Sequence, residues 1–214
     1  MLRTRAFPKR PHRPSLVGDE SGVATIEFAV LVPFLIALIF AAAEYVNAID
    51  NRNKVAALAR TLADLTSQGD ATSPISASLM TQIMGAADPV LAPFPASQAT
   101  AKIAAVGVYS VGGKQVPHIC SAWPPQSEAE RLVASQKLTV PPVYDRNGAR
   151  FIVAQVSMPY QPLFAAYLDR FLGPLDLSFT WNESVTWPVR GGVPGASAEP
   201  EVTLPGGVNC PPKL

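Results

Sequence analysis

The stretch VATIEFAVLVPFLIALIFAAAEYV, residues 23–46, decides the fold of this chain. As a helix it would be roughly 36 Å long at about 1.5 Å per residue, which exceeds the roughly 30 Å hydrocarbon core of a bilayer. Its charged residues are Glu27 and Glu44, one near each end. The residues between them are apolar on every face, which excludes an amphipathic surface helix. We therefore expect a single transmembrane helix over residues 23–46.

A basic leader precedes this helix. Residues 1–22 carry five cationic side chains, at Arg3, Arg5, Lys9, Arg10 and Arg13. Positive charge beside a membrane helix favours a cytoplasmic location for that flank. The rest of the chain is then expected to be periplasmic or extracellular.

Three interpretations of the apolar segment compete. The first is a signal anchor that stays uncut. The second is a secretory signal peptide cleaved after Ala43, because Ala41, Ala42 and Ala43 fit the small-residue rule for such sites. The third rests on Glu27, a carboxylate just inside the apolar helix, which is costly to insert and normally has a partner. The simpler alternative for Glu27 is that its side chain reaches the interface.

The residues around Glu27 carry a family resemblance. Gly22 lies five residues before Glu27 in the sequence GVATIEF, which resembles the processing site of type IV prepilins, where a membrane peptidase cleaves after glycine. The longer run GVATIEFAVLVPFL, residues 22–35, is similar to the start of TadE-like proteins, minor pseudopilins of the Tad (Flp) pilus system. The segment AALARTLADLTSQ, residues 56–68, resembles the helix that follows the anchor in that family.

The resemblance implies a function in pilus assembly. It implies cleavage by a prepilin peptidase between Gly22 and Val23, and roles for Glu27 and Phe28 in assembly, with Glu27 paired to the terminal amine of a neighbouring subunit. The implied partners are membrane lipid, the prepilin peptidase, other pseudopilins and pilus assembly proteins. The implied location is a bacterial inner membrane, single-pass, with a cytoplasmic N-terminus and a periplasmic C-terminal domain. No catalytic activity is implied.

The pattern beyond the apolar stretch predicts an α+β domain over residues 47–189. Val55, Leu58, Leu62 and Leu65 lie on one helical face, which needs a partner such as a sheet. Gly69 is suited to end this helix in a left-handed conformation, and Pro74 is expected in the first turn of the next helix. A Pro-rich loop is expected over 88–97. Short helices are expected over 128–135 and 161–172, and strands over 102–111, 114–121, 150–158 and 175–189. We expect a pilin-like arrangement of the long helix on an antiparallel sheet of about four strands, followed by an extended Pro/Gly-rich tail over 190–214.

The remaining chemistry is sparse. Cys120 and Cys210 could form a disulfide outside the cytoplasm, or they could be two unrelated thiols. These cysteines and the distant His12 and His118 form no cluster with metal-ligand spacing, so no metal and no cofactor are expected. Trp181 and Trp187 on the last strand are interpreted as core residues, with an exposed contact surface as the alternative. A net charge of +1 offers no basic patch for nucleic acid.

Overall fold

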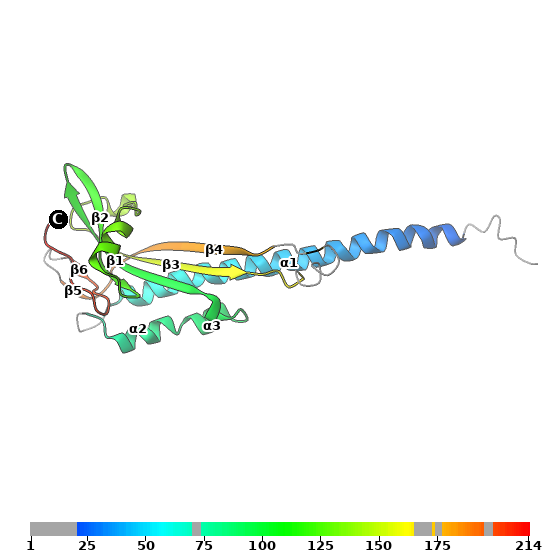
Figure 1. The fold of residues 1–214 in the computed structure, drawn as a ribbon, viewed down its shortest axis with the longest axis horizontal. Coiled ribbons are helices and arrows are strands. Elements are labelled where there is room, and N and C mark those ends of the chain that lie inside the picture. Colours follow the sequence, from blue (N-terminus) through cyan, green and yellow to red (C-terminus); the bar gives the residue numbers. More distant parts are fainter. Residues whose placement is uncertain (1–20, 70–73, 165–172, 174–176, 195–198) are drawn as a thin grey trace, which may run out of the picture. The chain divides into compact units, whose positions relative to one another are not determined.

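The structure is a computed structural model that describes residues 21–69, 74–164, 173, 177–194 and 199–214. The chain divides into two compact units, Met1–Tyr45 and Val46–Leu214. Helix α1 (Ser21–Ser67) begins in the first unit and ends in the second (Figure 1). The second unit contains the sheet and the short helices, so the α+β class is confirmed.

The second part of α1 packs as its periodicity predicts. Val55, Leu58 and Leu62 are completely buried, and Leu65 packs at the edge of the same cluster. Gly69 ends the helix with φ +67°, and its N–H donates to the Thr66 carbonyl over 3.1 Å. A positive φ is accessible to glycine at little cost, so the predicted left-handed end of the helix is confirmed.

Four antiparallel strands form the main sheet. They are β1 (Thr100–Val111), β2 (Lys114–Trp123), β3 (Arg150–Tyr160) and β4 (Phe179–Pro188), in the order β2-β1-β3-β4. The β1–β2 turn carries Gly112 and Gly113 with φ +58° and +79°, as the glycine pair predicts. Pro117 and Pro188 lie in β2 and β4, the two edge strands. Proline is tolerated in an edge strand because the outer side of that strand has no neighbouring strand for an N–H to bond.

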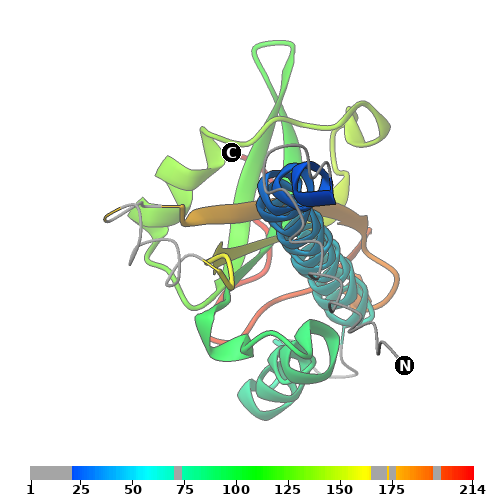
Figure 2. The same cartoon turned by 90° about the vertical axis from the view of Figure 1, so that its right-hand side faces the viewer.

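The two faces of the sheet hold separate cores. One face carries Ile152, Ala154 and Val156 of β3 against α1 and against α2 (Ala77–Met84). The other carries Phe151 and Val153, which pack with Ala134 of α4 (Glu128–Ser135). Figure 2 shows α2 and α4 at separate places around the sheet. The alternation of side chains along β3 thus divides the core into two layers.

Several expected boundaries change. Helix α2 begins after Ser76, whose side chain accepts from the Leu79 N–H over 3.2 Å, so Pro74 precedes the helix instead of standing in its first turn. The expected loop over 88–97 contains α3 (Ala87–Leu91) and the start of the 3₁₀ turn η1 (Ala96–Gln98). The predicted helix over 161–172 falls largely on residues outside the described ranges, as does part of the predicted start of the last strand.

The tail is a part of the core. Its residues form a small ladder between β5 (Val193–Pro194) and β6 (Pro200–Glu201), and Val202 and Leu204 are buried in the cluster that includes α1. The Leu204 N–H donates to Ser121 Oγ over 3.0 Å, and the Ile75 N–H donates to the Thr203 carbonyl over 2.8 Å. The sequence pattern indicates only an extended tail. Pro and Gly residues predict the local backbone conformation, and they do not predict which distant residues the tail contacts.

Candidate membrane and assembly site

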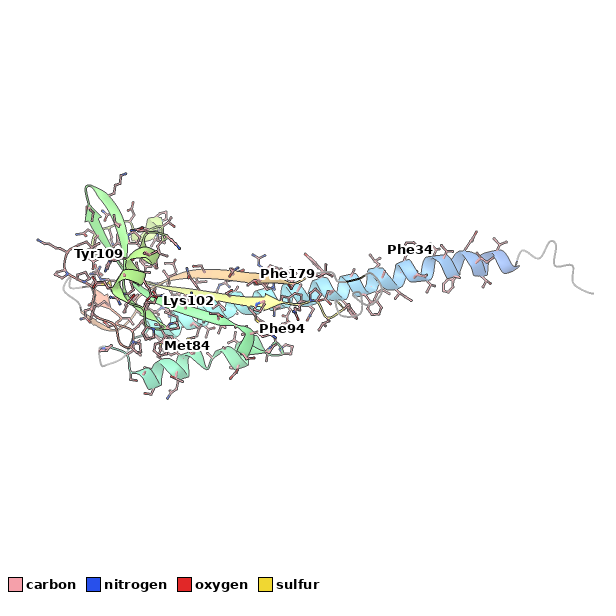
Figure 3. All side chains as sticks on the ribbon, in the orientation of Figure 1. Phe34, Met84, Phe94, Lys102, Tyr109 and Phe179 are labelled. Carbon is pink, nitrogen blue, oxygen red and sulfur yellow. A yellow bond between two sulfur atoms is a disulfide. The ribbon has the colours of Figure 1, made fainter. Side chains whose placement is uncertain are left out.

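The first part of α1 is an apolar helix with exposed side chains. Gly22, Val23, Glu27 and Phe28 are all exposed along it. So are most of the large apolar residues that follow, including Phe34, which Figure 3 labels. Among the described residues, α1 is the helix that is long and apolar enough to cross a membrane. An exposed apolar surface of this extent requires lipid or other apolar helices around it.

Gly22 and Glu27 are both exposed. Both lie in α1, five residues apart, and a Cβ added at Gly22 would meet no atom within 4 Å. An alanine at this position is therefore sterically harmless to the protein itself. Glu27 stands at the apolar end of the helix between Ile26 and Phe28, both exposed. Its carboxylate is thus surrounded by the surface that would face lipid.

A polar seam joins the second part of α1 to strand β4. Asp64 accepts from Trp187 Nε1 over 3.1 Å and from Arg190 Nη1 over 2.8 Å. Near the other end of the seam, Arg52 Nε lies 3.1 Å from Glu183 Oε1, and its guanidinium stands 5.5 Å from the Trp181 ring centre.

Trp181 and Trp187 are partly buried and pack against the core cluster that contains α1, so they lie at its edge. The sequence pattern did not indicate the acidic and basic partners of the seam, because they come from separate elements.

Cys120 and Cys210 are joined in a disulfide, with their Cα atoms 4.8 Å apart. The bond lies beside a second link between the tail and the sheet. Arg150 Nε and Glu201 Oε2 form an ion pair over 3.3 Å, and both side chains are 3% exposed. The Tyr109 hydroxyl completes the attachment by donating to the Pro211 carbonyl over 2.7 Å. Residues 201–211 are therefore held to β1, β2 and β3 by covalent, ionic and hydrogen-bonding contacts.

No reactive constellation occurs in the part of the chain that the structure describes. No group of three or more His, Cys, Asp or Glu side chains there is placed to hold a metal ion. A cavity of about 150 Å³ lies between α4 and the sheet, lined by alanines and aliphatic residues with Lys102, Lys137, Gln126 and Gln155. Its described lining lacks an acid, a histidine and a cysteine. Burial lowers the pKa of His118, with Arg131 acting in the same direction and Glu128 against it.

Comparison with known proteins gives one match. Residues 22–64 match the family described as TadE-like protein. Neither a curated protein nor a solved structure matches the chain significantly. The match begins at Gly22 and ends at Asp64, so it covers the apolar part of α1 and most of its packed part. The resemblance to the TadE-like family is confirmed over this segment, and it indicates a component associated with the Tad pilus.

Proposed function

We propose that this chain is a minor pseudopilin that takes part in assembling a Tad pilus. The TadE-like match over residues 22–64 is the starting point. The observation that carries the proposal is the exposed Glu27, five residues after Gly22, on a helix whose other exposed side chains are overwhelmingly apolar. A carboxylate in that setting is costly in lipid and becomes tolerable opposite a cation.

The proposed sequence of events begins with cleavage. A prepilin peptidase removes residues 1–22 and leaves Val23 as the new N-terminus. The resulting ammonium group of one subunit then pairs with Glu27 of its neighbour, because a buried ion pair is far less costly than either buried charge alone. The basic leader supports a cytoplasmic N-terminus, and the second unit would then lie in the periplasm.

The N-terminus of the mature protein tests the proposal. Edman degradation or mass spectrometry of the protein purified from membranes should find Val23. Met1 would indicate an uncut single-pass scaffold, and Glu44 a domain released by signal peptidase after Ala43. The variant Gly22→Ala should retain Met1, and since a Cβ at position 22 meets no atom within 4 Å, that result would reflect the peptidase alone. Recovery of Val23 from this variant would count against prepilin-type processing.

Glu27 is tested separately. Glu27→Ala should leave membrane insertion and cleavage intact and should abolish or strongly reduce piliation, counted by electron microscopy. Glu27→Asp, which keeps the charge on a shorter side chain, should retain part of the function. Normal piliation in Glu27→Ala would refute the proposed pairing. Thr25→Ala, another polar-to-alanine change in the same segment, serves as the matched control.

A further inference from the structure

We propose that the second unit docks on the membrane surface through an apolar patch at one end of strands β3 and β4. The patch consists of Leu163, Leu177 and Phe179. Their side chains are 65%, 40% and 41% exposed, respectively. The proposal rests on the membrane anchoring of residues 23–46 that is part of the proposed function, and it adds a second contact with the same bilayer.

Strand pairing brings the patch together. Tyr160 and Phe179 are register partners at the ends of β3 and β4. Leu163 follows Tyr160 by three residues, and Leu177 precedes Phe179 by two. At about 3.3–3.6 Å per residue, both leucines lie within roughly 11 Å of chain from this pair. The three exposed side chains therefore belong to one end of the sheet.

An aromatic cluster supports the patch from behind. The rings of Tyr160 and Phe179 have centres 5.2 Å apart, and those of Phe179 and Trp181 have centres 4.7 Å apart with an edge-to-face geometry. Figure 3 labels Phe179, which is on β4. Tyr160 is buried, and Trp181 is partly buried against the core cluster. The cluster therefore attaches the exposed Phe179 ring to the folded unit.

A hydrogen bond links this end of the sheet to the start of the second unit. Asn47 Nδ2 donates to the Tyr160 hydroxyl over 2.9 Å, and Asn47 is the first residue after the apolar stretch 23–46. Asp64, which bonds Trp187, lies seventeen residues further along α1, or about 25 Å at 1.5 Å per residue. Strand β4 thus runs along the second part of α1, with Phe179 at the end near Asn47 and Trp187 at the end near Asp64.

Because the chain runs directly from the apolar stretch to Asn47, we infer that the patch contacts the lipid surface. An interfacial apolar surface enters the headgroup region by about 5–10 Å, and the patch is linked through Tyr160 to Asn47, the residue that follows the apolar stretch. Because the helix tethers the unit to the bilayer, docking is an intramolecular event, and the effective concentration of lipid at the patch is high. Three apolar side chains are then sufficient to dock the unit, although they would be too few to bind a free domain to a membrane.

The test uses the full chain in vesicles of phosphatidylethanolamine and phosphatidylglycerol, with a nitroxide quencher attached to a fraction of the headgroups. The reporter protein carries Phe179→Trp together with Trp123→Phe, Trp181→Phe and Trp187→Phe. The comparison protein keeps Trp187 and carries only Trp123→Phe and Trp181→Phe. We expect strong loss of emission from the tryptophan at position 179 and little loss from Trp187. Adding Leu163→Ser and Leu177→Ser to the reporter should reduce the quenching towards the Trp187 level.

The matched control changes two exposed apolar residues elsewhere on the unit, Val133→Ser and Val143→Ser, and should leave the quenching of the reporter unchanged. Equal quenching at positions 179 and 187, or no effect of the leucine substitutions, would overturn the docking. Quenching that weakens as the protein-to-lipid ratio rises would instead assign the patch to contact between copies, which also overturns it. Flotation of the protein with the vesicles is measured in parallel. A protein that fails to float refutes the anchor and docking together, whereas one that floats without differential quenching refutes docking alone.

Discussion

Breaking the Cys120–Cys210 disulfide is expected to lower the free energy of unfolding by several kcal/mol without dissolving the native fold. The two cysteines are 90 residues apart. On the chain-entropy account, closing a loop of that length restricts the denatured chain by about 4.6 kcal/mol at 25 °C. The folded state should survive because Val202 and Leu204 remain in the core and Leu204 stays bonded to Ser121. The cross-link therefore acts mainly on the denatured chain.

The assay is guanidinium unfolding of the full chain in mild detergent, followed by tryptophan emission. Oxidised and reduced wild type are compared, because reduction removes the bond while both sulfur atoms stay in place. The variant Cys120→Ala/Cys210→Ala is the control and should show no response to reductant. Its stability should lie at or below that of the reduced protein, since two buried side chains are shortened.

If reduction lowers the free energy of unfolding by less than about 1 kcal/mol, the chain-entropy explanation is refuted. Such a result would mean that the denatured chain keeps residues 120 and 210 close together even without the bond. Loss of cooperative unfolding on reduction would refute the second half of the argument, that the tail stays packed without the bond.

Three further predictions concern the buried ion pair, a histidine and a close backbone contact. Glu201→Gln should lower the free energy of unfolding by about 3–5 kcal/mol, because it leaves the Arg150 charge buried without a counter-ion. Replacing both residues, as Arg150→Met/Glu201→Leu, should leave the stability roughly unchanged. A double-mutant cycle in which the costs of the two single substitutions simply add would contradict this prediction. Because burial lowers the pKa of His118 below its ordinary 6.5, the denatured chain binds more protons, and stability should fall as the pH drops below 6.5. His118→Asn should lose that part of the pH dependence, and an unchanged profile would exclude His118 as its source. Gly191→Ala should destabilise the unit by more than the typical 1 kcal/mol of a point change, since its Cβ would overlap the Gln68 carbonyl; an unchanged unfolding midpoint would contradict the described contact.

The helices and strands were largely predictable because their signals are local. The spacing of Val55, Leu58 and Leu62 defines the buried face of α1, and the glycine pair at 112 and 113 defines the β1–β2 turn. The candidate assembly site, with Gly22 and Glu27 five residues apart, is likewise read from neighbouring residues, and its role stays a prediction. Such features need only neighbouring residues, which a sequence displays directly.

The missed features depend on residues far apart in the chain. The seam of Arg52 with Glu183 and of Asp64 with Arg190 joins elements more than 120 residues apart. The pairing of Arg150 with Glu201 gave no signal either, because isolated charged residues in a sequence are ordinarily solvated. The apolar end patch was missed for the same reason, as Leu163 and Phe179 are brought together only by the β3–β4 register.

The position of residues 202–210 has a consequence for how the protein is made. Val202 and Leu204 complete a core that begins at Val55, so nearly 150 residues of chain separate the first and last contributors to that cluster. Contacts of such separation form slowly, because a long loop must close before they stabilise anything. We therefore expect the unit to stay unfolded throughout synthesis and to fold only after residue 210 has emerged. The anchor would then be seated in the bilayer before the domain it carries has acquired a stable shape.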